Sequence, residues 1–157
     1  MLNDSKILFM KVVVQRVKYA SCTIDGEVVG KIEKGFLLLV GITNGDDEET
    51  VRKVADKMVG LRIFEDENGK MNLELNQVNG EILSISQFTL YADCKHGKRP
   101  SFTNAARPEV SSPLYDYFNE YVRSLGYHVE TGKFGADMKI ELLNDGPVTI
   151  ILESDEL

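Results

Sequence analysis

The sequence predicts a single α+β domain in which two main helices pack on a mainly antiparallel, barrel-like β-sheet. Most of the chain consists of short apolar segments separated by Gly, Asn and Asp turns, which is typical of strands. Only two segments carry apolar residues at helical spacing. The length of 157 residues fits one domain, and no linker-like stretch marks a boundary.

The first third of the chain predicts three strands. The valine-rich segment Lys11–Ala20 forms the first, and the turn at Asp25-Gly26 leads into a second near Glu27–Ile32. Residues 36–40 form a continuous apolar run, which indicates a buried central strand.

Two helices are predicted. In the first, Asp46 or Asp47 caps a segment whose apolar residues recur at helical spacing, namely Val51, Val54, Ala55, Met58 and Val59. The second begins with Ser112 as N-cap and Pro113 as its first residue, and Gly126 ends it. Its expected buried stripe contains Leu114, Tyr117, Phe118, Tyr121, Val122 and Leu125.

Further strands are predicted between and after the helices. A short strand is expected at residues 62–64 and a long one at Glu81–Leu90, followed by an irregular connection from about Asp93 to Ser112. The last third predicts strands at 127–130, 138–143 and 148–152, the final two separated by a turn at 144–147.

Composition restricts the class of protein. No apolar run approaches the length of a membrane span, and residues 1–9 lack the features of a secretory signal, so a cytoplasmic protein with no membrane partner is expected. Cys22 and Cys94 are accordingly expected to be reduced thiols. The net charge of −7 opposes general affinity for nucleic acid, so an RNA partner requires a local basic patch.

Common cofactor and metal motifs are absent from the sequence. Neither GxGxxG nor GxxxxGK[ST] occurs, and the two histidines and two cysteines show no CxxC or HExxH spacing. We therefore expect no cofactor and no metal. Cys94 and His96 share the long connection, but their spacing is not a specific signature of a thiol nucleophile.

The connection after residue 93 is basic. It contains Lys95, Lys98, Arg99 and Arg107, and residues 95–108 include no Asp or Glu. This pattern is consistent with a surface that binds phosphates, and Phe102 and Asn104 could add base contacts. A solvated loop with a chance excess of positive charge explains the composition equally well.

Two polar segments also admit two interpretations. Ser86, Gln87 and Thr89 place three hydrogen-bonding side chains within a strand pattern, and they suit either a cleft or the solvent face of the strand. The Gly146-Pro147 step suits a tight turn. With a cis peptide bond it would direct its carbonyls where a trans bond cannot, and the sequence does not reveal the isomer.

Together these segments resemble the D-aminoacyl-tRNA deacylase family across residues 10–152. The resemblance begins at 10–17 and continues through 62–64 and 69–72. Its sharpest motifs are SQFTL at 86–90, RPSF at 99–102, TGKFGADM at 131–138 and NDGPVT at 144–149. Residues 1–9 precede the usual start of the family, so we expect them to be an extension from an upstream start codon or cloning, and residues 10–157 to form the deacylase domain.

The resemblance implies a homodimer that hydrolyses the ester of D-aminoacyl-tRNA, and of glycyl-tRNA mischarged on tRNA-Ala. It implies that a cis Gly146-Pro147 step enters the active site of the partner subunit and excludes L substrates, with Arg16 holding this loop. Ser86, Gln87, Phe88 and Thr89 would form the catalytic pocket, with Phe134 and Met138 on its wall. The expected tRNA contacts are Lys95, Lys98, Arg99 and Arg107.

For such an ester, positioning and oriented dipoles can suffice, with the tRNA ribose hydroxyl assisting an attacking water. A variant mechanism makes Thr89 the nucleophile, although no adjacent base is evident. Two other classes of function remain open: a non-catalytic RNA-binding module that uses residues 95–107, and a small-molecule esterase with Thr89 or Cys94 as nucleophile.

Overall fold

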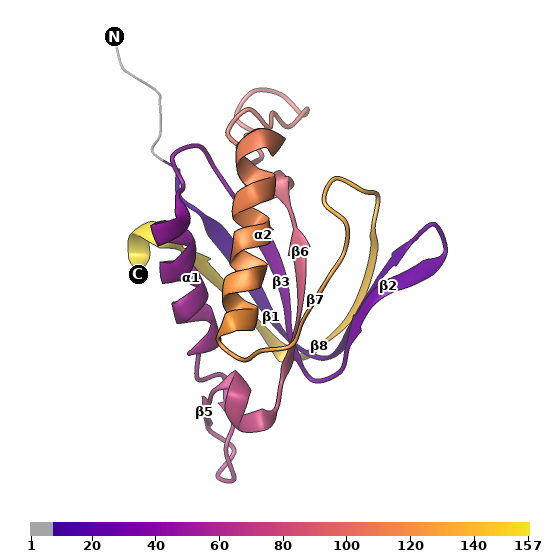
Figure 1. Cartoon of the computed structure of the whole chain (residues 1–157), viewed down its shortest axis with the longest axis vertical. Helices are drawn as coiled ribbons and strands as arrows, with labels where there is room; N and C mark the ends of the chain where they lie inside the picture. Colours follow the sequence, from indigo (N-terminus) through magenta and orange to yellow (C-terminus); the bar gives the residue numbers. More distant parts are fainter. Residues whose placement is uncertain (1–7) are drawn as a thin grey trace.

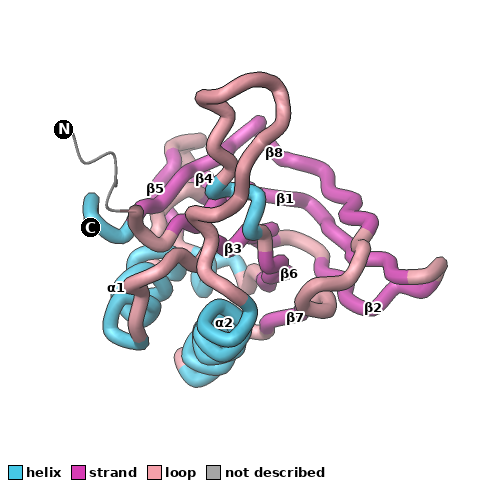
Figure 2. The backbone as a smooth tube through the Cα atoms, turned by 90° about the horizontal axis from the view of Figure 1, so that it is seen from above, coloured by secondary structure: helices cyan, strands magenta, loops and turns pink. Residues whose placement is uncertain are grey.

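The computed structural model describes residues 8–157 and contains one curved sheet covered on one face by two helices (Figures 1 and 2). The six strands of the main sheet are β1 (Lys11–Ile24), β2 (Glu27–Ile32), β3 (Gly35–Gly41), β6 (Glu81–Ser86), β7 (Val129–Thr131) and β8 (Lys139–Glu153). A small hairpin of β4 (Phe64–Glu65) and β5 (Met71–Leu73) lies apart. The helices are α1 (Glu48–Val59) and α2 (Pro108–Ser124), with short 3-10 turns η1 (Leu75–Val78), η2 (Phe88–Tyr91) and η3 (Ser154–Glu156).

The sheet is mixed. Strand β1 pairs antiparallel with β2, β3 and β8, which agrees with the predicted antiparallel arrangement. Strands β3, β6 and β7 instead run parallel to one another. Parallel neighbours need long crossover connections, and here α1 lies between β3 and β6 in the chain while α2 lies between β6 and β7. Both helices therefore return across the same face of the sheet.

Apolar side chains pack against both faces of the sheet and form two clusters. One cluster lies between sheet and helices and includes Phe36, Leu38, Val54 and Phe118. The other lies on the concave side and contains Val17, Ala20, Cys22, Ile32, Leu37, Leu83 and Ile85. Alternate residues of β3 thus serve different clusters, as strand geometry requires. The curvature brings β2 next to β7, which gives the predicted barrel-like core.

The predicted turn at residues 144–147 is wrong. These residues lie within a single strand, β8, which pairs with β1 on both sides of them. The register jumps from Gln15 opposite Thr149 to Val17 opposite Asn144, so the segment 145–148 lies opposite Arg16 alone. The segment is a wide bulge, because β1 continues to supply ladder partners on both sides of it.

Three other boundaries differ from the predictions. Helix α2 begins at Pro108 instead of Ser112, with Pro108 in the first turn and Pro113 inside the helix. The predicted strand 81–90 ends at Ser86 and passes into η2. The predicted strand at residues 62–64 contributes only Phe64 to β4. In each case packing of the neighbouring elements outweighs local propensity.

The ends of the described chain add two observations. Most of the predicted extension, residues 1–7, lies outside the described residues. The carbonyl of Phe9 accepts a hydrogen bond from the Tyr91 hydroxyl at 2.7 Å, and Met10 is fully buried. Among residues 8–157, the helices are too short or too polar to traverse a bilayer.

Candidate functional site: a cavity between two loop walls

A cavity of about 290 Å³ lies where the parallel strands β3 and β6 end. One wall is formed by Ser86, the last residue of β6, and by Gln87 and Phe88, which follow it. The opposite wall is the segment 134–138, which connects β7 to β8. The carboxyl ends of parallel strands are a common place for ligand sites, because the chain diverges there into loops. The structure therefore brings together two predicted motifs that lie far apart in the sequence.

The predicted pocket residues take different places around this cavity. Ser86, Gln87, Phe88, Phe134 and Met138 all line it. Thr89 does not line it; its side chain lies at the start of η2, where its hydroxyl accepts a hydrogen bond from the Gln87 side-chain amide. The Gln87 backbone N–H donates to Val40 O at 2.9 Å, which ties this wall to β3.

The η2 turn gives the cavity rim a set of available donors. The backbone N–H groups of Phe88 and Thr89 are the first two of the turn, so neither has an intrahelical acceptor. Both residues are exposed, and within residues 8–157 no other backbone acceptor is found for them. Such N–H groups can stabilise an oxygen that gains negative charge during a reaction.

A larger apolar hollow of about 540 Å³ adjoins the cavity. The two spaces share Phe88, Ala106, Ser111 and Phe134 as a common wall. The rings of Phe88 and Phe102 meet edge to face with centroids 5.2 Å apart, and Phe88 is 56% exposed. Exposed aromatic rings beside an apolar hollow suit a flat ligand such as a nucleobase.

The four predicted tRNA-binding side chains project from the long connection between η2 and α2. Lys98 and Arg99 are exposed and line neither space. Arg107 borders the apolar hollow at the start of α2, 3.9 Å from the Glu109 carboxylate, and its side chain is almost fully exposed. Lys95 lies beside a separate small depression near Lys11 and Tyr91. The positive charge is thus spread along the connection, and of the four side chains only Arg107 borders either space.

The Gly146-Pro147 peptide bond is cis, and both residues are exposed on the β8 bulge. Two side chains hold the bulge in place. Arg16 is 5% exposed and donates from Nε to Asp145 O at 2.8 Å and from Nη1 to Ile63 O at 2.7 Å. The Asn144 side chain accepts from Val148 N–H at 2.7 Å and donates to Val148 O at 3.1 Å. Neither Gly146 nor Pro147 lines the cavity of its own chain.

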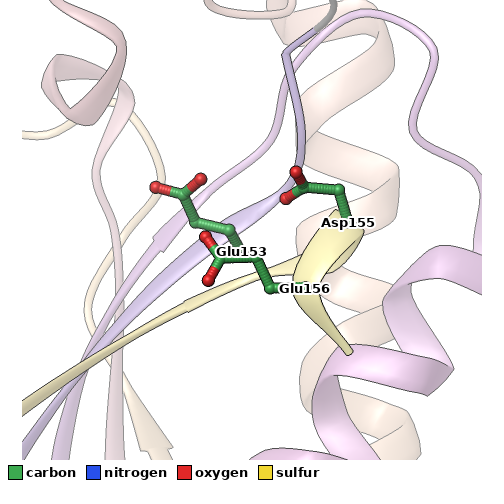
Figure 3. Close-up of side chains that lie close together, drawn as sticks. All are labelled: Glu153, Asp155 and Glu156. Carbon is green, nitrogen blue, oxygen red and sulfur yellow. The ribbon is translucent and has the colours of Figure 1, made fainter.

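Other candidate chemistry finds little geometric support. Cys94 and His96 are exposed on the basic connection, and within residues 8–157 no hydrogen bond joins them. Glu153, Asp155 and Glu156 gather at the end of β8, where their carboxylate oxygens lie within 4.8 Å of one another (Figure 3). Glu153 also lies 3.6 Å from Lys11 Nζ, so part of this charge is already paired.

Comparison with known proteins assigns the family. Residues 13–153 match the protein family described as D-Tyr-tRNA(Tyr) deacylase. The chain belongs to this family. Proteins named D-aminoacyl-tRNA deacylase from Bacillus cytotoxicus and Halalkalibacterium halodurans are 60% and 58% identical to it. Each of these comparisons spans 145 residues, 92% of this chain and 99% of the relative.

Two solved structures share the fold of this chain. One described as a "c-Myc DNA Unwinding Element Binding Protein" is 40% identical, with a TM-score of 0.84 over 91% of this chain and 97% of its own. Another, described as "a probable eukaryotic D-amino acid tRNA deacylase", has a TM-score of 0.79 over 93% of this chain and 100% of its own. At 18% identity, the second likeness concerns the deacylase fold alone.

Sequence reasoning did not single out Ala106, Ser111 or Tyr115, which lie at or behind the two spaces. Ala106 and Ser111 line both spaces, and Tyr115 lies one turn further along α2 behind Phe134. Ser111 and Tyr115 are four residues apart, which would have indicated a common helix face had the helix been predicted to begin at Pro108; Ala106 precedes the helix and carries no such signal. Burial raises the pKa of Tyr115, so its hydroxyl remains a hydrogen-bond donor.

Proposed function

We propose that this protein hydrolyses the ester bond between a D-amino acid and the terminal ribose of tRNA. The observation that carries the proposal is the cavity itself, because the two segments that form its walls are the SQFTL and TGKFGADM motifs of the family. The names of the 58–60% identical relatives, which are D-aminoacyl-tRNA deacylases, support the same activity.

The two adjoining spaces suit the two parts of such a substrate. The smaller cavity, with Ser86 and Gln87 on its wall, would receive the aminoacyl group. The apolar hollow beside Phe88 and Phe102 would receive the terminal base by stacking. The basic connection would follow the phosphates of the acceptor end, which a chain of net charge −7 would otherwise repel.

The chemistry needs no nucleophilic side chain. A water molecule attacks the ester carbonyl carbon, with the neighbouring ribose hydroxyl assisting its deprotonation. The bond from the carbonyl carbon to the ribose oxygen then breaks, and that oxygen takes up the proton, which gives free amino acid and tRNA. The Phe88 and Thr89 N–H groups would stabilise the oxyanion, while the cavity walls hold the ester in place.

Selection between mirror-image substrates would depend on a second subunit. The bulge carrying Gly146 and Pro147 projects from β8 and is flanked on that strand by Leu143 and Ile151, which are 47% and 60% exposed. Exposed apolar side chains on a long strand support contact with another copy of the chain. The bulge would then enter the partner's cavity and present main-chain atoms to the amino group.

Rigid main-chain atoms can exclude an L side chain because no rotamer change makes room for it. Arg16 and Asn144 restrain the bulge through hydrogen bonds to its backbone. A D side chain would point away from the bulge, and glycine offers no side chain to exclude. Glycyl-tRNA, including glycine mischarged on tRNA-Ala, would therefore be a substrate as well.

The test is deacylation of matched D-tyrosyl-, L-tyrosyl- and glycyl-tRNA by the full chain and by its Pro147→Ala variant. We expect the wild type to hydrolyse the D and glycyl esters and to spare the L ester. Alanine restores a backbone N–H and frees φ, so the variant should lose activity or chiral selectivity. The matched control is Pro113→Ala, an exposed proline of α2 that lines neither space.

Three results would contradict the proposal. Binding of tRNA with no ester loss would favour a non-catalytic RNA-binding module. Hydrolysis of simple esters that is blocked by thiol reagents would favour a small-molecule esterase with Cys94 as nucleophile. A wild-type protein that is monomeric in sedimentation while fully selective would remove the role of the partner's bulge.

A further inference from the structure

A buried polar contact joins Tyr115 of α2 to Ser84 of β6, near the end of the strand that borders the cavity. Tyr115 is 4% exposed, and its hydroxyl donates to Ser84 O at 2.7 Å. The Ser84 hydroxyl, also fully buried, donates to the Tyr115 oxygen at 3.4 Å. The surrounding interface is mostly apolar, since Phe118 and Val122 of α2 pack there against the sheet. Polar contacts inside such an interface are specific in geometry because an unpaired group costs free energy.

Ser84 lies where the pairing between β6 and β7 ends. It belongs to the last pair of the β6–β7 ladder, opposite Thr131. Beyond this pair the two strands separate. Strand β6 continues to Ser86 and is followed by Gln87, whereas β7 leads into the segment 134–138. The proposed aminoacyl cavity is the space between them. The Tyr115 hydroxyl thus holds the Ser84 carbonyl at the point where the cavity begins.

The same side chain also supports the opposite wall. The Tyr115 ring lies against that of Phe134, with centroids 6.2 Å apart and planes tilted by 45°. Its neighbours one turn away on α2 are Ser111, which lines the cavity, and Asn119, which is 3% exposed. Within the described residues, Asn119 Oδ1 is a buried polar atom without a hydrogen-bond partner. Asn119 thus adds a further buried polar group beside Tyr115 in this mostly apolar interface.

We infer that Tyr115 is a positioning residue that sets the width of the aminoacyl cavity by holding both of its walls from α2. Its hydroxyl holds the β6 wall through Ser84, and its ring holds the facing wall through Phe134. The inference rests on the proposed function, since it assigns a role within that reaction. Tyr115 does not reach the reacting atoms and has no direct part in bond breaking.

The test compares two substrates on the same preparation of full-length protein. Tyr115→Phe removes the hydroxyl and keeps the ring, so the β6 wall is released while the contact with Phe134 remains. We expect the ratio of kcat/KM for D-tyrosyl-tRNA to that for glycyl-tRNA to change by about fivefold, because the larger aminoacyl group depends more on the width of the cavity. This ratio does not depend on the fraction of folded protein, so simple destabilisation leaves it unchanged.

Two further variants complete the design. Tyr121→Phe also removes a tyrosine hydroxyl from α2, but that hydroxyl donates to Asp56 on α1, away from the cavity, so the ratio should match the wild type. Ser84→Ala removes the serine hydroxyl but keeps the carbonyl that accepts from Tyr115, so it should also preserve the ratio.

The outcomes separate the inference from the proposed function. A wild type that hydrolyses neither ester overturns the proposed function. An active wild type with an unchanged ratio in Tyr115→Phe overturns the positioning role alone, as does a Tyr115→Phe protein that fails to fold in thermal unfolding. A changed ratio in Tyr115→Phe, with Tyr121→Phe and Ser84→Ala unaffected, supports the positioning role.

Discussion

Arg16 shows how a single side chain fixes the shape of the exposed β8 bulge. It is the residue of β1 opposite the β8 bulge, and its guanidinium links Asp145 O to Ile63 O. A guanidinium can donate to two acceptors at once in a fixed plane, which lysine cannot do. The bulge therefore depends on a side chain from another strand for its shape. The roles of Thr89 and of the side chains in the basic connection can likewise be tested by substitution.

We expect Thr89→Ala to retain turnover of D-tyrosyl-tRNA within about threefold of the wild type, because a threonine nucleophile needs an adjacent base. The side chain that contacts its hydroxyl is the amide of Gln87, which cannot accept a proton. Single-turnover deacylation measures the effect. A loss of about a thousandfold or more, with an acyl-enzyme burst in the wild type, would establish Thr89 as the nucleophile.

We expect the double variant Lys98→Ala/Arg99→Ala to raise KM for aminoacyl-tRNA by about tenfold at low salt, with kcat unchanged. Both side chains are exposed and line neither space of the site. The slope of log KM against log salt should fall by about 1 to 2, as lost phosphate contacts require. Lys53→Ala/Lys57→Ala removes two exposed charges from α1 and is the matched control. Equal effects of the two pairs would show only a general dependence on net charge.

At the scale of elements, the connection from β3 to α1 links the helix layer to the basic segment. Asp47 caps α1 by accepting from Thr50 N–H at 2.8 Å, and Asp46 accepts from Thr43 N–H at 2.8 Å. The Thr43 hydroxyl in turn donates to Asn104 O at 2.7 Å. Burial raises the pKa of Asp46 to about 6, whereas hydrogen bonds from Thr50 lower the pKa of Asp47. The contributions of these two neighbouring carboxylates to folding stability therefore change with pH in opposite directions.

Asp46→Asn should raise thermal stability above pH 6, and the gain should disappear as pH falls towards 4. The folded-state pKa lies above the unfolded value, so the ionised carboxylate reduces stability at neutral pH and protonation removes that cost. The gain should be on the order of 1 kcal/mol, allowing for partial solvent screening. Unfolding measured from pH 4 to 8 provides the check.

Asp47→Asn is the matched control for this measurement. Its folded-state pKa is lowered, so its contribution to stability is present above the unfolded pKa and is lost as pH falls. Asparagine caps a helix about as well as aspartate, so the change should act mainly through charge. The same pH trend in both variants would contradict the assignment of Asp46 as the buried carboxyl.

At the scale of the whole molecule, closure of the sheet brings together segments that are distant in the chain. Strand β2 approaches β7 at Gly30, which is buried. A Cβ atom placed there would lie 2.7 Å from Thr131 O and 3.2 Å from Leu83 Cδ1. Thr131 is the last residue of β7, and the chain runs from it into the second wall of the cavity. Closure of the sheet at Gly30 is therefore coupled to the position of this wall.

We therefore expect Gly30→Ala to destabilise the protein by about 1–3 kcal/mol, since the backbone of β7 must move to accept the methyl group. Urea unfolding gives the value. Gly60→Ala is the control, because Gly60 has φ −90° and its added Cβ would meet no atom closer than 3.4 Å. Equal stabilities of the two variants would show that β2 and β7 are not tightly packed at this point.

The sequence by itself determined the fold class, the presence of the two helices and the motifs of the family, because periodicity and turn chemistry are local properties. Of the stripe predicted for the second helix, Phe118 and Val122 are buried and Leu125 is exposed. Phe36 and Val54 are buried as their patterns predicted. It also placed Ser86 and Phe134 in one site, through the resemblance. The start of α2 was misjudged because Pro113 is a common first helical residue, whereas packing extends the helix back to Pro108.

Tertiary structure decided what depends on contacts between distant segments. The parallel pairing of β3, β6 and β7 follows from where the two helices cross the sheet. The segment 145–148 is a bulge and not a turn because β1 supplies partners on both sides of it. The contacts of Tyr115 with Ser84 and Phe134 exist only once α2 lies against β6. Such contacts join residues far apart in the chain, so no local pattern encodes them.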